Sequence, residues 1–129
     1  MEEQLLNAAK VGDVSTIRRL VAEGADVNVL GAGGFSPLQW AAYRGHVEVA
    51  KTLVELGADK EAPDADGVRP LHVAAYYGHV EVLTALAELG ADFGALTATG
   101  ETPLRVSIRF GQHQAAQVLR ELERSARTN

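Results

Sequence analysis

Apolar residues recur along this chain at the three- and four-residue spacing of an amphipathic helix. Two stretches show this spacing most clearly: Val47, Ala50, Leu53 and Val54, and then Val80, Leu83, Leu86 and Ala87. Such spacing places the apolar side chains on one face of a helix. Each stretch runs into the sequence ELGAD, at residues 55–59 and 88–92. Each therefore predicts a helix that ends in a polar turn.

The whole pattern repeats every 33 residues. The period is carried by Pro37, Pro70 and Pro103, by Gly34, Gly67 and Gly100, by Gly45, Gly78 and Gly111, and by Leu5, Leu38, Leu71 and Leu104. Proline favours the first position of a helix, where its missing N–H would have no partner. Glycine favours the left-handed conformation that ends a helix. Each unit therefore predicts a first helix that runs from its proline to the glycine at Gly45, Gly78 or Gly111, and then the apolar second helix.

Two segments carry this unit almost whole: SPLQWAAYRGHVEVAKTLVELGAD at 36–59 and RPLHVAAYYGHVEVLTALAELGAD at 69–92. They closely resemble the ankyrin repeat, a 33-residue unit that contains T-P-L-H-x-A. The resemblance covers residues 1 to about 124. It implies an all-α solenoid of stacked antiparallel helix pairs with projecting β-hairpin or turn fingers. We expect one domain over 1–129, with repeats at about 1–30, 31–63, 64–96 and 97–126 and a frayed tail at 127–129.

The last unit is more polar than the units before it. Arg120 stands where Ala87 and Val54 lie one and two periods earlier, and His113 stands in the place of Val80. Solenoids need terminal units with a polar outer face in order to remain soluble. We therefore expect a complete four-repeat array, with two full units between two caps.

Composition narrows the possible functions. The formal net charge of -5 disfavours nucleic-acid binding, which depends on neutralising phosphates. The absence of cysteine excludes disulfides and thiolate chemistry. No apolar run approaches 18 residues, and the N-terminus lacks the features of a signal peptide. We expect a monomer that does not bind membranes and lies in the cytoplasm or elsewhere inside the cell.

The histidines are better explained as scaffold than as metal ligands. His46 and His79 hold equivalent positions in neighbouring units. Stacked helices lie about 8–10 Å apart, too far for both side chains to reach one ion. His72 is the histidine of the repeat motif, and the resemblance implies that it bonds neighbouring backbone and steadies a turn.

No motif points to catalysis or to a cofactor. The glycine-rich segment Gly31–Gly34 precedes a helix but lacks the spacing of a P-loop, and Ser36 interrupts the dinucleotide pattern. A tightly packed finger tip is expected, with a phosphate or small-ligand site as a weaker alternative. Asp64 and Asp66 are expected to form a turn. We predict no enzyme activity, no cofactor and no metal.

The resemblance implies protein binding through a concave groove, formed by the finger tips and the exposed side of the first helices. By register, the groove positions are Phe35, Tyr43, Arg44, Asp66, Val68, Tyr76, Tyr77, Glu101, Arg109 and Phe110. Aromatic residues and arginine are typical of binding hot spots. We expect at least three exposed aromatic side chains here, with Tyr76 and Trp40 partly buried.

The sequence does not identify the partner. The link between the second and third units carries Asp59, Glu61, Asp64 and Asp66 against Lys60 alone. These residues are either solvated turns or an acidic rim that steers a basic segment of another protein. The competing alternative is a designed or reconstructed scaffold with no native partner.

Two single residues stand out. Arg69 occupies the position of Ser36 and Thr102, whose hydroxyls can cap the helix that follows. Arg69→Thr is therefore expected to stabilise the protein by roughly 1 kcal/mol, unless Arg69 makes a compensating contact with the acidic turns. Asn28 follows Asp-Val with a leucine upstream, a pattern that is hydroxylated in some ankyrin proteins, although it is also the ordinary turn of the family.

Overall fold

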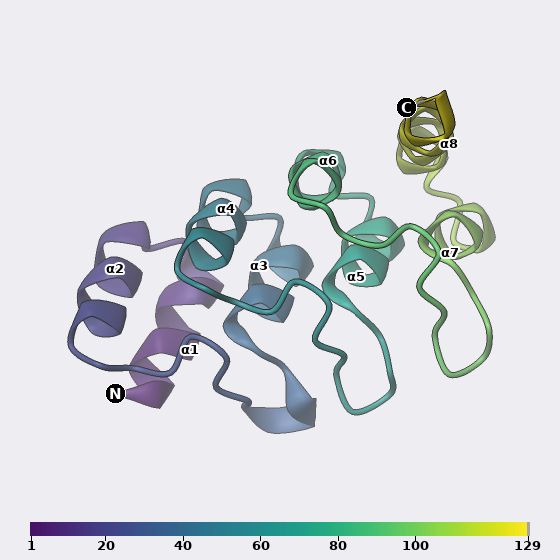
Figure 1. The fold of residues 1–129 in the computed structure, drawn as a ribbon. Helices are drawn as coiled ribbons and strands as arrows, with labels where there is room; N and C mark the ends of the chain where they lie inside the picture. The colour runs from purple at the N-terminus through teal and green to yellow at the C-terminus, as the bar shows by residue number, and fades with distance from the viewer. Residues whose placement is uncertain (129) are drawn as a thin grey trace.

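The computed structural model describes residues 1–128, which form four antiparallel helix pairs stacked side by side (Figure 1). The inner helices are α1 (Glu2–Val11), α3 (Pro37–Arg44), α5 (Pro70–Tyr77) and α7 (Pro103–Arg109), and the outer helices are α2 (Val14–Ala22), α4 (Val47–Glu55), α6 (Val80–Glu88) and α8 (His113–Thr128). A short 3-10 helix, η1, spans Ala32–Gly34. The predicted fold class is confirmed.

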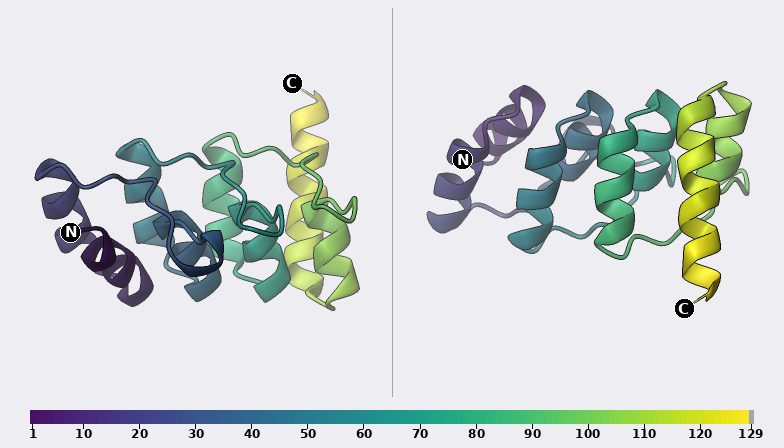
Figure 2. Two further views of the ribbon diagram at one scale, coloured as in Figure 1. Left: turned by 90° about the horizontal axis from the view of Figure 1, so that it is seen from below. Right: turned by 90° about the horizontal axis from the view of Figure 1, so that it is seen from above.

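The helices form two layers, and the fingers project to one side of the inner layer (Figures 1 and 2). Each finger is closed by one backbone hydrogen bond of 2.9 Å. The three donor–acceptor pairs are Gly31 N–H to Phe35 C=O, Asp64 N–H to Val68 C=O, and Thr97 N–H to Glu101 C=O. No residue of 1–128 is assigned to a strand, so these fingers are turns rather than β-hairpins.

The helices begin and end where local chemistry predicts. Ser36 Oγ accepts the N–H of Gln39 at 3.2 Å, and Thr102 Oγ1 accepts the N–H of Arg105 at 3.2 Å. Gly45 and Gly78 follow α3 and α5 in the left-handed conformation, with φ of 76° and 70°. α7 differs, because it ends at Arg109 and Phe110 forms its C-cap, one residue before Gly111.

The core lies between the two layers. Leu5, Leu38 and Leu71 are fully buried in α1, α3 and α5, and so are the alanine pairs of the same helices. The small alanine side chains let neighbouring inner helices approach closely. In α7 the second position of the pair is Ile108, which is half exposed at the end of the stack.

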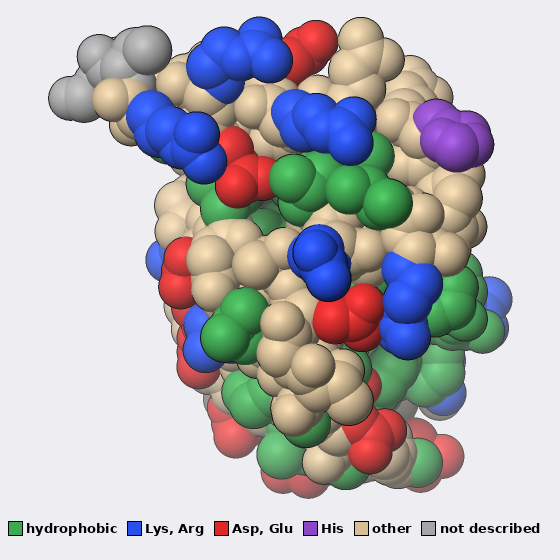
Figure 3. All heavy atoms as spheres, turned by 90° about the vertical axis from the view of Figure 1, so that its right-hand side faces the viewer, with side chains coloured by type: hydrophobic (Ala, Val, Ile, Leu, Met, Phe, Trp, Pro, Cys, Tyr) green, Lys and Arg blue, Asp and Glu red, His purple; other side chains and the backbone are tan. Residues whose placement is uncertain are grey.

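α8 is longer than the other outer helices. Glu123 stands where earlier units carry the turn glycine, and the helix continues to Thr128. Residues 127 and 128 of the expected tail belong to α8, while Asn129 lies outside the described residues. Arginines gather at this end of the molecule (Figure 3). Arg120, Arg124 and Arg127 line a hollow beside Leu104 and Glu123.

Side chains at the start of α4, α6 and α8 tie neighbouring repeats together. His46 Nε2 bonds the carbonyl of Lys10 at 2.9 Å, and His79 Nε2 bonds that of Tyr43 at 3.0 Å. One period later, Gln112 Nε2 donates to the carbonyl of Tyr76 at 2.9 Å. The structural interpretation of His46 and His79 is confirmed. Gln112 continues the same set, although the sequence analysis did not single it out.

Arg69 has the compensating contact that would offset its missing cap. Its Nη1 lies 3.1 Å from Oε1 of Glu61, and both side chains are about one-third exposed, at 33% and 30%. The other oxygen of Glu61 accepts the N–H of Asp92 at 2.9 Å. Arg69 therefore belongs to a link between the end of the second repeat and both ends of the third, and the simple expectation for Arg69→Thr needs correction.

Arg69→Thr alone should change the free energy of unfolding by less than about 1 kcal/mol, because the gained cap offsets the lost ion pair. In a Glu61→Gln background, where that ion pair is already absent, the same substitution should stabilise by about 1 kcal/mol. Urea denaturation of the four proteins measures both values. An equal effect of Arg69→Thr in the two backgrounds would show that the ion pair contributes nothing.

Candidate partner-binding groove

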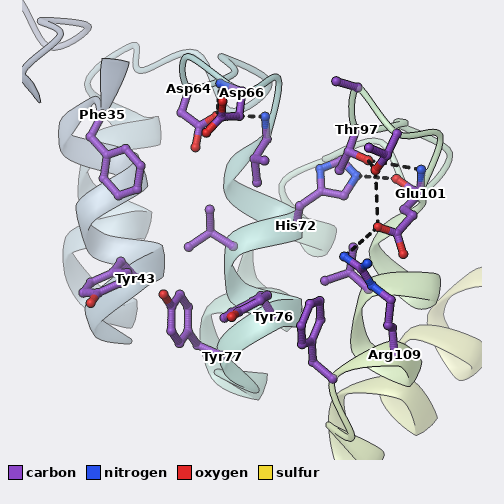
Figure 4. Close-up of a pocket in the computed structure, with 16 residues that line it drawn as sticks. Phe35, Tyr43, Asp64, Asp66, His72, Tyr76, Tyr77, Thr97, Glu101 and Arg109 are labelled. Carbon is purple, nitrogen blue, oxygen red and sulfur yellow. Dashed lines mark hydrogen bonds and ion pairs between the residues drawn. The ribbon is translucent and has the colours of Figure 1, made fainter. Parts of the chain in front are cut away.

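A hollow of about 340 Å³ lies over α5, between the finger at 64–68 and the finger at 97–101 (Figure 4). Nine of the ten predicted groove residues line it: Phe35, Tyr43, Asp66, Val68, Tyr76, Tyr77, Glu101, Arg109 and Phe110. The tenth, Arg44, lies outside the lining, with its guanidinium 5.9 Å from the ring centroid of Trp40. We call this hollow the groove.

Aromatic rings form a continuous row across three repeats. The successive centroid distances are 5.2 Å for Phe35–Trp40, 5.6 Å for Trp40–Tyr43, 4.7 Å for Tyr43–Tyr77, 4.6 Å for Tyr77–Tyr76 and 4.3 Å for Tyr76–Phe110. Most of these pairs are edge-to-face, the arrangement that aromatic quadrupoles favour. The contacts between repeats join residues that are one position out of register: Tyr43 contacts Tyr77 rather than its equivalent Tyr76, and Tyr76 contacts Phe110 rather than its equivalent Arg109.

Four rings of the row remain exposed. The exposed fractions are 36% for Tyr43, 39% for Tyr76, 42% for Tyr77 and 41% for Phe110. Trp40 is half-buried as expected, whereas the expectation that Tyr76 is partly buried is wrong. Burial, followed by the neighbouring Tyr43, raises the pKa of Tyr77 above its ordinary value. Its hydroxyl is therefore neutral at physiological pH, able to donate and to accept.

Two rings of the row, one on each side of Tyr76 and Tyr77, already carry cations. Lys10 Nζ lies 4.4 Å from the ring centroid of Trp40, and the guanidinium of Arg109 lies 4.5 Å from that of Phe110. Among the described residues, no cation covers the ring of Tyr76 or of Tyr77. The middle of the row therefore presents bare aromatic surface to the groove.

Charge is distributed unevenly around the groove. Arg109 Nη2 pairs with Oε1 of Glu101 at 2.9 Å, so these two charges neutralise each other. On the opposite finger, Asp64 Oδ1 accepts the N–H groups of Asp66 and Val68 at 2.8 and 3.0 Å. Within residues 1–128, neither Asp64 nor Asp66 has an ion-pair partner. The finger at 64–68 is therefore the acidic side of the groove.

The acidic link divides into two parts with different roles. Asp59 accepts the N–H of Glu61 at 2.9 Å, and Glu61 holds Arg69 and the backbone of Asp92. These two carboxylates stabilise the turns between repeats. Of the four acidic residues in this link, Asp64 and Asp66 are the two that line the groove.

His72 forms the back wall of the groove and is buried. Its Nε2 lies 2.9 Å from the carbonyl of Ala95 and 3.1 Å from that of Glu101, while its Nδ1 accepts the N–H of Arg69 at 3.3 Å. Both ring nitrogens are thus engaged, and the role implied by the repeat motif is confirmed. Burial lowers the pKa of His72 below its ordinary value, so the ring is neutral.

Some lining residues were not predicted as groove positions. They are Asp64, His72, Val73, Thr97 and Val106. Val73 and Val106 follow Trp40 by one and two periods, so the repeat register could have identified them. Thr97 could not be identified in this way. Its hydroxyl accepts the N–H of Glu101 at 3.2 Å, a bond that depends on the backbone conformation of this one finger.

The glycine-rich finger has a structural explanation. A Cβ placed on Gly34 would lie 2.9 Å from the backbone nitrogen of Ala65, so only glycine fits between the two fingers. The N–H groups of Gly31, Gly34 and Phe35 donate to carbonyls of the same finger. These donors are therefore not available to an anion.

Asn28 also connects two repeats. Its Oδ1 accepts the N–H of Asp59 at 2.8 Å, and its Nδ2 lies 3.5 Å from the carbonyl of Gly57. Its side chain thus stabilises the junction of the first two repeats.

Sequence comparison agrees with this architecture. The family model for ankyrin repeats (3 copies) matches residues 5–97 and 63–129, which together cover nearly the whole chain. The chain belongs to the ankyrin repeat family, whose members are generally non-catalytic modules that bind other proteins.

A curated relative was also found. A vapyrin-like protein of Medicago truncatula is 40% identical over 42 residues, which are 33% of this chain and 9% of that protein. This chain therefore matches only a small part of that relative's length. Separately, none of the helices within residues 1–128 has the length and apolar character needed to cross a bilayer.

Proposed function

We propose that this chain is a non-catalytic binding module whose protein partner docks in the groove over α5. The observation that carries this proposal is the row of six aromatic rings, four of which remain exposed in one hollow. Contiguous exposed apolar surface on a folded protein is typical of an interaction site. Tyrosine and arginine also dominate the residues that contribute most to protein interfaces.

Other ligand classes fit the groove less well. Three carboxylates and one guanidinium line it, which disfavours a phosphate backbone. The glycine-rich finger uses three of its N–H groups internally, which disfavours the phosphate alternative. His72 has both ring nitrogens engaged and Glu101 is paired with Arg109, so neither of these two residues is available as a catalytic base. We place the module inside the cell, because its sequence contains no cysteine, and we expect it to be a monomer.

The double variant Tyr76→Ala/Tyr77→Ala tests the groove assignment. Truncating one interface hot spot costs 2 kcal/mol or more, so the proteins that wild type retains from a lysate should fall about 10-fold or further. Both side chains are exposed, so the fold should persist and far-ultraviolet circular dichroism should not change. Affinity capture with quantitative mass spectrometry measures the recovery.

The matched control is Leu89→Ala, which truncates an exposed side chain just after α6, in the outer layer. It should recover the same proteins in the same amounts as wild type. If the tyrosine variant also retains them all, the groove is not the binding surface. That outcome would favour a scaffold without a native partner, or a binding surface on another face.

A further inference from the structure

The groove has a bare aromatic middle and one acidic side, and these features lie on opposite sides of the hollow (Figure 4). Tyr76 and Tyr77 form the floor at the end of α5, while Asp64 and Asp66 lie at the tip of the finger. Val68 and Val73 add apolar lining to the same hollow. An occupant that contacts the aromatic, the apolar and the acidic parts of this lining must have a long apolar stem and a positive charge at its end.

We infer that the groove takes a long basic side chain, arginine before lysine, from an extended segment of the partner protein. This inference rests on the proposed function and specifies the chemistry of the partner. The methylene groups of such a side chain pack on Val68 and Val73, as basic residues commonly pack their stems on apolar surface. Its head group then lies between the rings and the two carboxylates.

The molecule's own contacts show why a cation suits the middle of the row. Lys10 covers Trp40 on one side of the two tyrosines, and Arg109 covers Phe110 on the other. Tyr76 and Tyr77 lie between these rings, and no cation among the described residues covers them. A cation over a ring is attracted by the ring's quadrupole, and arginine makes this contact more often than lysine. A partner's arginine would repeat an arrangement that the chain already has on both sides of these tyrosines.

Charge complementarity supports the same occupant. Arg109 would repel a basic ligand if its charge were free, but Glu101 holds it at 2.9 Å. Asp64 and Asp66 have no ion-pair partner within residues 1–128, so their charges remain for a ligand. The formal net charge of -5 for the whole chain adds attraction at longer range.

The test begins with a displayed library of random linear dodecapeptides, selected on the wild-type protein. We expect selected peptides to share one arginine or lysine beside apolar residues. Synthetic copies are then measured by fluorescence polarisation against wild type and against Asp64→Asn/Asp66→Asn. Asparagine keeps the side-chain oxygen that accepts the turn's N–H groups, so the variant loses charge and retains the finger. Its affinity for the peptide should fall about 10-fold, as for the loss of a close charge pair at an interface.

A second substitution in the peptide shows whether the two charges meet. Replacing the shared basic residue by glutamine should weaken binding to wild type by a similar factor, and should have little further effect on the double variant. Such non-additivity is the sign of a direct contact. The control is Asp26→Asn, because Asp26 accepts the N–H of Asn28 in a similar turn away from the groove. It should bind like wild type.

The outcomes separate this inference from the proposed function. The selected peptides could fail to bind Tyr76→Ala/Tyr77→Ala and yet carry no basic residue, or show no coupling to Asp64 and Asp66. Either result would overturn the inference that the groove takes a basic side chain. The assignment of the groove as the binding surface would still stand. Peptides that bind the tyrosine variant unchanged would overturn both. Light scattering could instead show that the wild type is a dimer and that Asp64→Asn/Asp66→Asn is a monomer. That result would indicate that the acidic side of the groove binds the arginines of α8 in a second copy of this chain. It would overturn the inference that the basic side chain comes from a different protein.

Discussion

Replacing His72 with alanine should lower the free energy of unfolding by about 3 kcal/mol. The buried ring holds the carbonyls of Ala95 and Glu101 through Nε2 and the N–H of Arg69 through Nδ1. Alanine leaves these groups without their partner and opens a cavity at the back of the groove. Since each repeat of a solenoid contacts only its neighbours, the loss falls on the junction of the third and fourth repeats.

The chain contains its own conservative replacement for this histidine. Gln39 lies one period before His72, and its Nε2 donates to the carbonyls of Ala62 and Val68 at 3.0 and 2.8 Å. These carbonyls are the equivalents of Ala95 and Glu101. Gln39 Oε1, however, has no partner among the described residues. His72→Gln should therefore keep the two bonds to the carbonyls, lose the bond from Arg69, and cost about 1 kcal/mol.

The two variants should also differ in how pH affects stability. Burial lowers the pKa of His72 in the folded protein, so the unfolded chain binds a proton there at a higher pH than the folded chain does. The free energy of unfolding of wild type should therefore fall as pH drops through 6.5 toward the folded pKa, by at most about 1.4 kcal/mol per pH unit from this residue. His72→Gln should lack this contribution.

Urea denaturation between pH 7.5 and pH 5.0 measures both effects. The difference in stability between wild type and His72→Gln should shrink as pH falls, because only wild type loses the contribution of the neutral ring. A difference that stays constant over this range would show that His72 has the same pKa in the folded and unfolded chains. A loss of less than 1 kcal/mol in His72→Ala would contradict the structural role of the ring.

Gly34→Ala should also destabilise the protein strongly, by about 3 kcal/mol. Gly34 has a φ of 76°, which costs any residue with a Cβ roughly 1 kcal/mol or more. In addition, the new Cβ would lie 2.9 Å from the backbone nitrogen of Ala65. The N–H of Ala65 donates to the carbonyl of Gly33 at 3.0 Å, so the second finger cannot move away without breaking this bond.

Gly100→Ala is the matched control for this substitution. Gly100 occupies the same position two periods later, with a φ of 80°, and a Cβ there would have no neighbour within 4 Å. It should therefore lose only the backbone contribution, about 1 kcal/mol. Denaturation of the two variants gives the difference directly. Equal losses would mean that the first two fingers are not packed against each other as described.

The repeat period accounts for most of what could be predicted about the fold. Prolines, glycines and buried leucines recur at fixed positions, so one unit defines the helices of the others. Among the contacts that were missed is one that a single unit makes. The ion pair of Arg69 with Glu61 depends on the path of the segment 59–69 and has no equivalent in the other described repeats, whereas the bond of Glu61 to the N–H of Asp92 repeats that of Asn28 to Asp59 one period earlier. The continuation of α8 to Thr128 likewise lies beyond the repeated pattern.

The groove was predictable in position but not in detail. The register places Tyr43, Tyr76 and Phe110 at the end of their inner helices, and the structure brings these side chains to one surface. Their exposure depends on how the rings tilt against each other, which residue positions alone do not determine. The pairing of Glu101 with Arg109 joins two residues that the sequence marked separately, and it leaves the acidic charge of the groove on the other finger.

The most direct test of the central claim is a crystal structure of the protein with a peptide selected on the wild type. We expect the peptide to cross α5 between the two fingers, with ring contacts at Tyr76 and Tyr77 and a basic side chain directed toward Asp64 and Asp66. A peptide bound to the outer helices, or to the arginine-rich end at α8, would contradict the assignment of the groove as the binding surface.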